Sequence, residues 1–498
     1  MRRVYVRELK PYSLSKLGKL FGYPPPQTAE LVRGLMMRGI VRRRTGRESD
    51  PEEIDVVNAA PDELYQFRFV GLALIGDVTL VAYPKYFRES EPTDNELGLI
   101  MQAIQHRDGV LAAPRLVDDG ATTDDKLPVM LALLELYGEY GEYSNHIEGF
   151  ELNGNGDIDW NRTIGKHLPI LSNGKPIYTE YETRKTFRDD SDYITRLHRV
   201  VLTECSQALH KAGIEKLLSL DEVRLTDEEL EDFGAVETLS QRIERERSIQ
   251  FIDWKLQTLD LLERYLINRA SDVHRDEVRM LGTSVYYKVW EDACKTAFND
   301  ALQKPLASLG IALEDDWANE GYAKLIGIIP HPQWERWNGV GFDKPDGTDT
   351  LIPDTVSVAH GADGTKSFCI YDAKYYVPTA SGKMRYQPDL ESVTKQFLYQ
   401  SAYRSFIEAH QFNRVTNVFL VPGTVNEPEL MARVSFPNVI AKEEEPFDNY
   451  IYMWMLPAND VLKAYLGGKT LKDEITQITG IAMTRPSGAE SNAPADEP

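Results

Sequence analysis

The sequence predicts a multi-domain α/β protein. The chain has 498 residues, of which 42% are hydrophobic, enough for several sizeable cores. Apolar residues at helical spacing alternate along the chain with short β-branched runs, so both element types are expected. The expected units are residues 1–47, a basic winged-helix-like module; 60–180, a β-rich domain; 181–270, a helical linker region; 276–470, an α/β domain built on a hairpin; and 484–498, a disordered tail.

Composition favours a cytoplasmic protein. No apolar run approaches the roughly 18 residues of a membrane-spanning helix, and the N-terminus lacks the apolar segment of a signal peptide. The three cysteines are odd in number and widely spaced in apolar surroundings, so we expect reduced core residues rather than a metal site. They are Cys205, Cys294 and Cys369.

The first 47 residues have an unusual charge. They hold twelve Arg or Lys against Glu8 and Glu30, although the whole chain has a net charge of −22. Residues 13–22 and 27–39 are expected helices, and 40–44 an expected strand, which is the layout of a winged helix-turn-helix. Two alternatives remain: a docking surface for a partner subunit, and a small helical subdomain whose basic residues are merely solvated. If the module is a winged helix-turn-helix that binds DNA, Gln27, Thr28 and Arg33 face the bases, and Arg42, Arg43 and Arg44 face the phosphates.

The middle of the chain predicts a hairpin followed mostly by helices. Leu64–Leu74 and Val78–Tyr83 are its strands, and residues 48–60 before them are a polar linker. Expected helices are 94–106, 125–140, 189–211 and 226–268, with β-like segments through 147–180. The core stripe of the longest helix is Ile249, Ile252, Leu256, Leu259, Leu262 and Leu266.

A second hairpin has the pattern that is most informative about chemistry. Two apolar runs flank the Gly-containing turn 360–364; the first begins at Pro353-Asp354 and the second ends in Asp372-Ala373-Lys374. Because side chains alternate along a strand, Asp372 and Lys374 share a face, and a hairpin can bring Asp354 beside Asp372. Two carboxylates, with the Ala373 carbonyl as a third ligand, suit Mg²⁺, and Lys374 can orient a water. The alternative is a chance pattern of solvated residues.

Helices flank this hairpin on both sides. The amphipathic segment 284–298 carries Glu291, and the helix 393–409 carries Lys395, Gln396 and Tyr399 within one turn of each other. Further strands are expected at 415–421 and 450–456. The pair Trp334 and Trp337 either stacks on a base or, as we expect, fills a loop packed against the sheet. The histidines in this half of the sequence form no His-x-x-His arrangement, which argues against a zinc site.

The Pro-Asp…Asp-x-Lys pattern resembles the PD-(D/E)XK nuclease signature. The chain as a whole resembles the LlaJI-type restriction endonucleases, which are related to the McrC nuclease subunits of McrBC systems. The Gln396-x-x-Tyr399 spacing is one residue shorter than the Gln-x-x-x-Tyr of some relatives in the superfamily. The segments that carry the resemblance are V-W-E-D-A-C at 289–294, I-P-D-T-V at 352–356, Y-D-A-K-Y-Y at 371–376, T-K-Q-F-L-Y-Q-S-A-Y at 394–403, N-V-F-L-V-P at 417–422, and two stretches at 69–87 and 157–164.

The resemblance implies the nuclease subunit of a restriction system for phage defence, which cleaves DNA with Mg²⁺. Glu291, Asp354 and Asp372 would be the metal-binding acids, Lys374 the water-positioning base and Gln396 a supporting group. A McrB-like AAA+ GTPase and cognate DNA methyltransferases are the implied partners, and the absence of a Walker A motif fits a separate NTPase subunit. The alternatives are a non-catalytic assembly subunit and a DNA-binding regulator.

Overall fold

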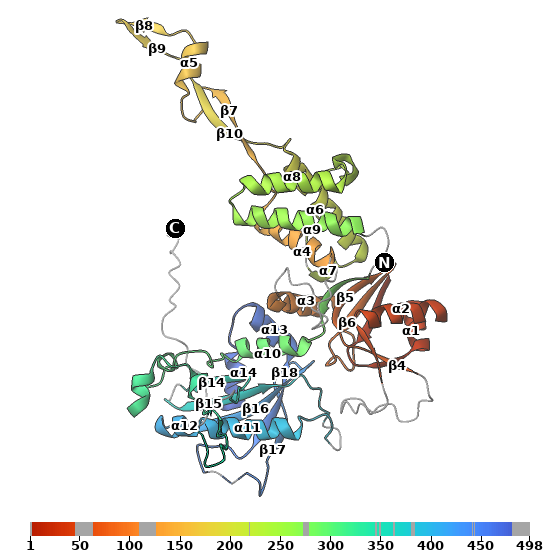
Figure 1. Ribbon diagram of the computed structural model, residues 1–498, viewed down its shortest axis with the longest axis vertical. Coiled ribbons are helices and arrows are strands. Elements are labelled where there is room, and N and C mark those ends of the chain that lie inside the picture. The colour runs from red at the N-terminus through yellow and green to blue at the C-terminus, as the bar shows by residue number, and fades with distance from the viewer. Residues whose placement is uncertain are drawn as a thin grey trace, which may run out of the picture.

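The computed structural model describes residues 2–44, 63–108, 126–218, 220–271, 278–343, 346–347, 350–361, 364–379, 384–440, 442 and 444–480. They form a mixed α/β structure with several sheets, in which a helical body and a projecting arm separate the first and last units along the chain (Figure 1). The expected linker at 48–60 and the expected tail at 484–498 lie outside the described residues.

The two N-terminal helices form where they were expected. Helix α1 (Leu14–Phe21) begins at Ser13, whose hydroxyl accepts the Lys16 N–H, and ends at Gly22 in the left-handed conformation. Helix α2 (Pro25–Met37) starts with proline at its first position, where no N–H is needed. A small sheet of order β2-β4-β3 accompanies them, with β2 directly before α1. Its strands are β2 (Pro11–Ser13), β3 (Val41–Arg43) and β4 (Leu64–Phe67).

A second N-terminal sheet has the order β1-β6-β5-β11. Its strands are β1 (Arg2–Arg7), β5 (Val70–Ile75), β6 (Val78–Tyr83) and β11 (Val278–Thr283). The expected single strand 64–74 is wrong, because the chain leaves one sheet after Phe67 and enters the other at Val70. Residues 1–47 were treated as a module of their own, whereas one buried cluster joins Val6, Leu17 and Leu35 to Phe67, Leu80 and Met280.

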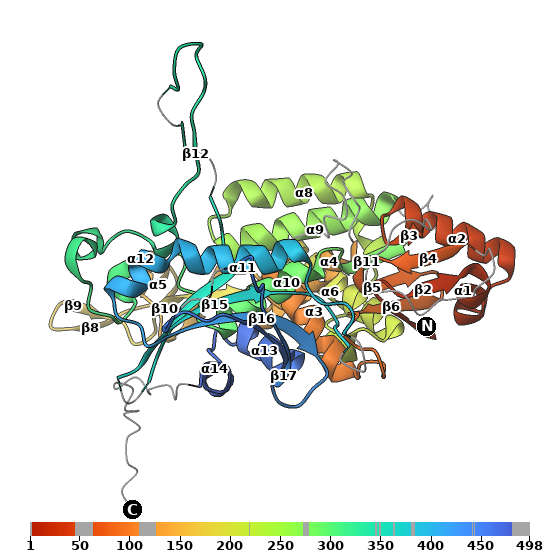
Figure 2. The same ribbon diagram turned by 90° about the horizontal axis from the view of Figure 1, so that it is seen from below.

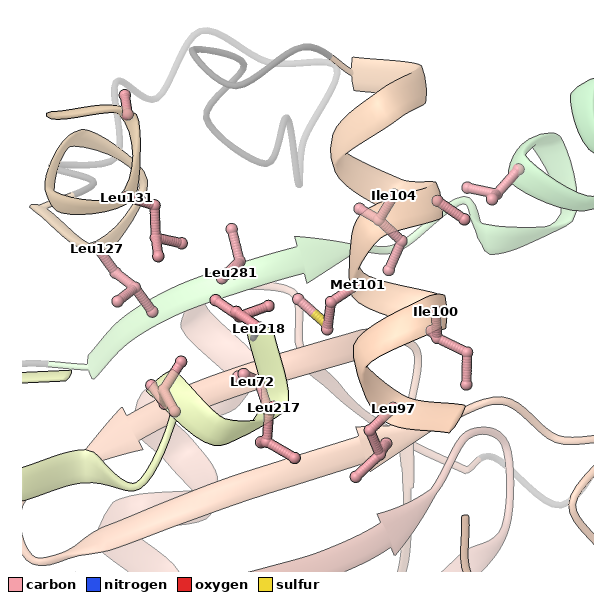
Figure 3. Close-up of a cluster of buried hydrophobic side chains, with 14 of the residues drawn as sticks. Leu72, Leu97, Ile100, Met101, Ile104, Leu127, Leu131, Leu217, Leu218 and Leu281 are labelled. Carbon is pink, nitrogen blue, oxygen red and sulfur yellow. The ribbon is translucent and has the colours of Figure 1, made fainter. Parts of the chain in front are cut away.

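Helices form the body that follows. They are α3 (Asp94–Asp108), α4 (Lys126–Tyr140), α6 (Tyr193–Ala212), α7 (Glu215–Leu218), η1 (Leu230–Phe233), α8 (Val236–Ile249) and α9 (Asp253–Ser271). Figure 3 shows Leu72 and Leu281 of the second sheet facing Met101, Leu131 and Leu217 of the helices. The expected helix 226–268 is broken at Gln250, where the backbone is extended. As a result, Ile249 and Ile252 leave the expected stripe and are 68% and 47% exposed.

A narrow arm extends away from helices α6, α8 and α9 (Figure 1). It consists of β7 (His146–Leu152), α5 (Trp160–Lys166), β8 (Ile170–Ser172), β9 (Lys175–Ile177) and β10 (Glu182–Arg188). Strands β7 and β10 pair along their whole length, and β8 and β9 form a separate hairpin. The arm has large apolar side chains exposed to solvent: Ile147, Leu152, Trp160, Ile164, Leu168, Ile170, Leu171 and Ile177.

The C-terminal unit is a five-stranded sheet of order β14-β15-β16-β18-β17. Strands β15, β16 and β18 are parallel, while β14 and β17 run antiparallel at the two edges. Helices α11 and α12 cover one face and α13 the other (Figure 2), and α10 packs on α13. The elements are α10 (Tyr286–Ala297), η3 (Leu306–Ser308), η4 (Asp315–Glu320), η5 (Leu325–Ile328), β12 (Gln333–Trp334), β13 (Asp346–Gly347), β14 (Thr355–His360), β15 (Lys366–Ala373), α11 (Leu390–Ala402), α12 (Arg404–Ala409), β16 (Arg414–Gly423), β17 (Glu429–Val434), β18 (Ile451–Pro457), α13 (Ala458–Leu466) and α14 (Lys472–Thr479).

Two expectations from composition can be compared with the described residues. All three cysteines are free and buried, as core residues should be. Over the described ranges, no helix combines the length and the apolarity that crossing a membrane would require.

Candidate active site

The hairpin β14–β15 brings Asp354 and Asp372 together. Thr355 pairs with Tyr371 in the antiparallel register, which places Asp354, the residue before β14, opposite Asp372. Residues opposite each other in such a pair have Cβ atoms about 5 Å apart. The two carboxyl groups are close enough to share a hydrogen bond, and Asp354 Oδ2 also accepts the N–H of Ala373 at 3.1 Å.

Lys374 lies on the same side as Asp372, as strand alternation requires. Its Nζ is 3.0 Å from Asp372 Oδ2, and the Asp372 side chain is only 7% exposed. The backbone N–H of Lys374 donates to the Leu420 carbonyl, which continues the pairing of β15 with β16. Burial alone would lower the pKa of Lys374, but the carboxylates of Asp372 and Asp354 raise it above its ordinary value. Lys374 is therefore an ammonium ion in this arrangement.

The electrostatics of the carboxyl pair favour a cation. Burial and the adjacent Asp372 carboxyl raise the pKa of Asp354 to about 8, while Lys374 acts in the opposite direction. Near neutral pH the pair therefore holds a proton, because two carboxylates this close repel each other. A divalent cation would relieve the same repulsion, and Mg²⁺ is commonly bound through one or two carboxylates together with several waters. The donor set thus fits a hard divalent cation.

Glu291 lies on α10, but the structure does not join it to this pair as a third metal ligand. Its Oε1 accepts from Lys295 Nζ at 2.7 Å, one turn further along the helix. Burial would lower the pKa of Lys295, yet Glu291, Asp292 and Asp354 raise it, so the Lys295 ammonium is within electrostatic reach of both Glu291 and Asp354. Across the described ranges, no three His, Cys, Asp or Glu side chains are grouped so as to hold a metal ion.

Lys295 is the residue of this region that the sequence analysis missed. Its only sequence signal is the i,i+4 spacing from Glu291, which is common on exposed helices. The proximity to Asp354, 59 positions along the chain, comes from the packing of α10 near the sheet.

The resemblance implied that Gln396 is a supporting group of the site, and the structure places its side chain against the backbone of the sheet. Its side chain is fully buried, and its amide nitrogen donates to the carbonyls of Ile370 and Val418, at 3.4 and 3.3 Å. These carbonyls belong to β15 and β16, so Gln396 ties α11 to both strands. Lys395 is half-exposed and paired with Glu391.

Tyr399 is bonded to the segment that leads into Asp354. Its hydroxyl donates to the Ile352 carbonyl at 3.1 Å, two residues before Asp354. Burial raises the pKa of the Tyr399 phenol, and the negative charges of Asp372 and Asp354 raise it further. Tyr399 therefore stays protonated and holds the segment that leads into Asp354.

The expected DNA-contacting residues of the N-terminal region divide into two groups. Gln27, Arg33, Arg42 and Arg43 are exposed and Arg44 is partly buried, and Arg43 is ion-paired with Glu63. Thr28, by contrast, is buried, and its hydroxyl donates to backbone carbonyls of the preceding turn. The expectation that Thr28 faces the bases is wrong, because its side chain is buried and bonded to the turn before α2.

The tryptophan pair is also placed differently. Trp334 and Trp337 are 70% and 58% exposed. They belong to a hairpin that projects from the C-terminal unit at β12 (Figure 2), not to a loop packed against the sheet.

Comparison with known proteins gives first the class and then the family. The matching family model describes a restriction endonuclease, and a curated relative is a component of a restriction enzyme. Residues 69–310 and 312–439 match the model of the LlaJI restriction endonuclease, so the chain belongs to that family. This match confirms the resemblance inferred from the sequence.

The relatives differ in how much of each chain they share. The type II restriction enzyme BsuMI component YdjA of Bacillus subtilis (strain 168) is 26% identical over 290 residues, 57% of this chain and 55% of that protein. The chain thus spans little more than half the length of this relative.

Two solved structures are similar in part. One, at 13% identity and TM-score 0.34, is the refined half-complex from the tetradecameric assembly of Thermococcus gammatolerans McrB AAA+ hexamers with bound McrC, and the match covers 94% of this chain and 99% of that one. The other, at 12% identity and TM-score 0.21, is the Thermococcus gammatolerans McrBC complex, and the match covers 54% and 87%. Both scores are too low to establish a shared fold or partner.

Proposed function

We propose that this chain is the nuclease subunit of a restriction system and that it cleaves DNA phosphodiester bonds with Mg²⁺. The observation that carries the proposal is the convergence of Asp354, Asp372 and Lys374 at one end of the C-terminal sheet. That cluster lies in a chain of a restriction endonuclease family. We assign the sheet and its flanking helices to a PD-(D/E)XK core on the same observation.

Asp354 and Asp372 would hold the cation, with the Ala373 carbonyl as a further ligand. When bound, Mg²⁺ supplies a Lewis acid that lowers the pKa of a water and offsets charge on the scissile phosphate. Lys374, as an ammonium ion beside Asp372, donates hydrogen bonds that orient a water or a phosphate oxygen. It can accept a proton only when the negative charge of its neighbours is offset, because those charges raise its pKa. Glu291 could act as a third ligand only after its contact with Lys295 opens.

A separate subunit would supply NTP hydrolysis. No Walker A motif is present in the sequence, so we propose a McrB-like AAA+ GTPase as the partner, with DNA methyltransferases protecting host DNA. The projecting arm is the docking element that we propose, because solvated monomers rarely expose so many large apolar side chains on one narrow segment. At the outer end of the arm, Leu171 belongs to the hairpin of β8 and β9, and Leu168 lies just before that hairpin. Leu168 and Leu171 are 94% and 74% exposed.

The alternatives are less consistent with these observations. A non-catalytic assembly subunit would have no use for a carboxyl pair with a raised pKa and an adjacent lysine. A DNA-binding regulator would use the exposed arginines of the N-terminal unit and leave the same cluster without a role.

The test compares Lys374→Ala with Lys288→Ala, an exposed lysine on α10 outside the cluster. Both proteins are assayed with the partner NTPase, GTP or ATP, Mg²⁺, and unmethylated and cytosine-methylated DNA. Loss of the ammonium group should lower the cleavage rate by about 10²-fold or more, comparable to removing one preorganised electrostatic group. The Lys288 variant should cleave at the wild-type rate. Wild-type cleavage by Lys374→Ala would assign the nuclease to another subunit.

A further inference from the structure

A buried carboxylate of the N-terminal unit contacts the segment that follows Lys374. Glu8 is only 7% exposed and lies directly after β1. Its backbone N–H donates to the Tyr83 carbonyl at 2.9 Å, which fixes it to the end of β6. Glu8 is thus held rigidly by the N-terminal sheet, and its side chain points out of that unit toward the C-terminal one.

Hydrogen bonds among Glu8, Lys85 and Tyr375 join the two units here. The Tyr375 hydroxyl donates to Glu8 Oε2. The backbone N–H of Lys85 lies 3.3 Å from both Glu8 Oε2 and the Tyr375 oxygen, and it donates to the two together. The ammonium group of Lys85 lies 4.7 Å from the centre of the Tyr375 ring. These contacts converge on the Tyr375 hydroxyl and ring, which fixes Tyr375 in one geometry against the N-terminal unit.

Aromatic packing surrounds these hydrogen bonds. The Tyr375 ring lies 5.4 Å from that of Tyr286, at the start of α10, and 6.4 Å from that of Tyr86, next to Lys85. The helix that carries Glu291 and the strand that carries Asp372 therefore meet the N-terminal unit at one point.

A second contact fixes the chain two residues later. The Arg88 guanidinium donates to the Val377 carbonyl and lies 5.2 Å from the centre of the Tyr386 ring. Residues 375–377 are therefore held at both ends by the segment 85–88, which belongs to the N-terminal unit.

The position of Lys374 depends on this segment. Strand alternation sends the Lys374 side chain to the side of Asp372 and the Tyr375 side chain to the opposite side. A rotation of Tyr375 about the backbone therefore turns Lys374 away from the aspartate pair. We propose that Glu8 is a positioning residue, which acts through Tyr375 to place Lys374 for the reaction; this inference rests on the proposed nuclease function.

The test uses the full chain with its NTPase partner and four substitutions. Glu8→Ala and Tyr375→Phe each break the hydrogen bond, whereas Glu8→Gln retains an acceptor. Tyr65→Phe is the matched control, because Tyr65 is a buried phenol of the same unit whose hydroxyl donates to the Glu63 carboxylate and not to the chain beside Glu8. Single-turnover cleavage and the KM for DNA are measured, and hydrogen exchange of the peptide 374–379 is followed in the absence of DNA.

Glu8→Ala and Tyr375→Phe should each lower the single-turnover rate by about 10- to 100-fold, the range expected when a catalytic group is misplaced by about 1 Å. The KM for DNA should not change, and the double variant should be no slower than the slower single variant, because both remove the same bond. Exchange of the peptide 374–379 should become faster. Glu8→Gln should restore most of the rate, and Tyr65→Phe should match the wild type.

Two results would overturn the positioning role. One is a wild-type rate and wild-type exchange in Glu8→Ala. The other is an equal loss in Tyr65→Phe, which would show general loosening of the N-terminal unit. If the wild type cleaves DNA and the Glu8 and Tyr375 variants cleave it equally well, the positioning role is refuted and the nuclease proposal stands. Where the wild type cleaves no DNA, the nuclease proposal fails, and unchanged exchange in Glu8→Ala independently refutes the contact.

Discussion

Replacing Asp372 with asparagine should make the metal-free protein more stable at alkaline pH. The substitution keeps the size of the side chain and removes its charge next to Asp354. Burial and Asp372 together raise the pKa of Asp354 from 3.8 to about 8, which corresponds to roughly 6 kcal/mol between its two protonation states. Because the folded state binds the proton more tightly, this group favours folding below about pH 4 and loses that contribution as pH rises toward 8.

The expected magnitude follows from the contacts of Asp372. Its charge is one of two causes of the shift, so removing it should return about 2 kcal/mol to the folded state at pH 8. Asp372 also pairs with Lys374, and weakening that pair offsets part of the gain. We expect a net stabilisation of about 1 kcal/mol, or about 2–4 °C in Tm for a domain of 150–250 residues.

The assay is thermal unfolding from pH 5 to pH 9, with EDTA and with Mg²⁺. In EDTA the variant should exceed the wild type at pH 8. Near pH 5 Asp354 is protonated in both folded proteins, so only the weakened pairing with Lys374 remains and the variant should be slightly less stable than the wild type. Mg²⁺ should stabilise the wild type, by about 2.7 kcal/mol at a concentration of 100 Kd, and the variant far less. Asp300→Asn is the control, because burial raises the pKa of Asp300 without an adjacent carboxyl and Asn can still accept the Val356 N–H. Equal Mg²⁺ stabilisation of all three proteins would refute the carboxyl pair as the metal site.

Three further outcomes are expected. Gln396→Ala should destabilise the chain by about 1–3 kcal/mol in denaturant titrations, because two buried carbonyls of β15 and β16 lose their donor; no loss would show that these bonds do not hold α11. The triple substitution of Arg42, Arg43 and Arg44 to alanine should reduce the log–log salt slope of DNA binding by about 0.9 for each phosphate that the arginines no longer neutralise, and an unchanged slope would favour a protein-docking role for this surface. Leu168→Asp with Leu171→Asp should abolish co-purification with the NTPase without changing Tm, since both side chains are exposed, whereas intact assembly would exclude the outer arm as the docking element.

Local rules were sufficient for the centre of the candidate site. Strand alternation and the hairpin turn predicted that Asp354, Asp372 and Lys374 would meet, and the register of β14 with β15 places them accordingly. The helix boundaries at 94–106 and 189–211 were also predicted to within a few residues, because capping and periodicity are local. The LlaJI restriction endonuclease family was predicted from sequence motifs, and the family match confirms it.

Tertiary packing decided what the sequence did not predict. The path of residues 250–252 between α8 and α9 removes Ile249 and Ile252 from a stripe that periodicity alone had joined. Thr28 looks like an exposed helix residue until the turn before α2 supplies its carbonyl partners. Lys295 and Glu8 come close to Asp354 and Tyr375 from distant parts of the chain, and no local pattern encodes such contacts.

The central claim is that Asp354 and Asp372 hold a divalent cation. Crystals of the protein grown with Mn²⁺, whose anomalous scattering distinguishes it from water, would test this claim directly. We expect an anomalous peak between the two carboxylates at about 2.0–2.2 Å from an oxygen of each, and no such peak in Asp372→Asn. A protein that binds Mn²⁺ elsewhere, or that shows no peak at this pair under saturating Mn²⁺, would contradict the assignment.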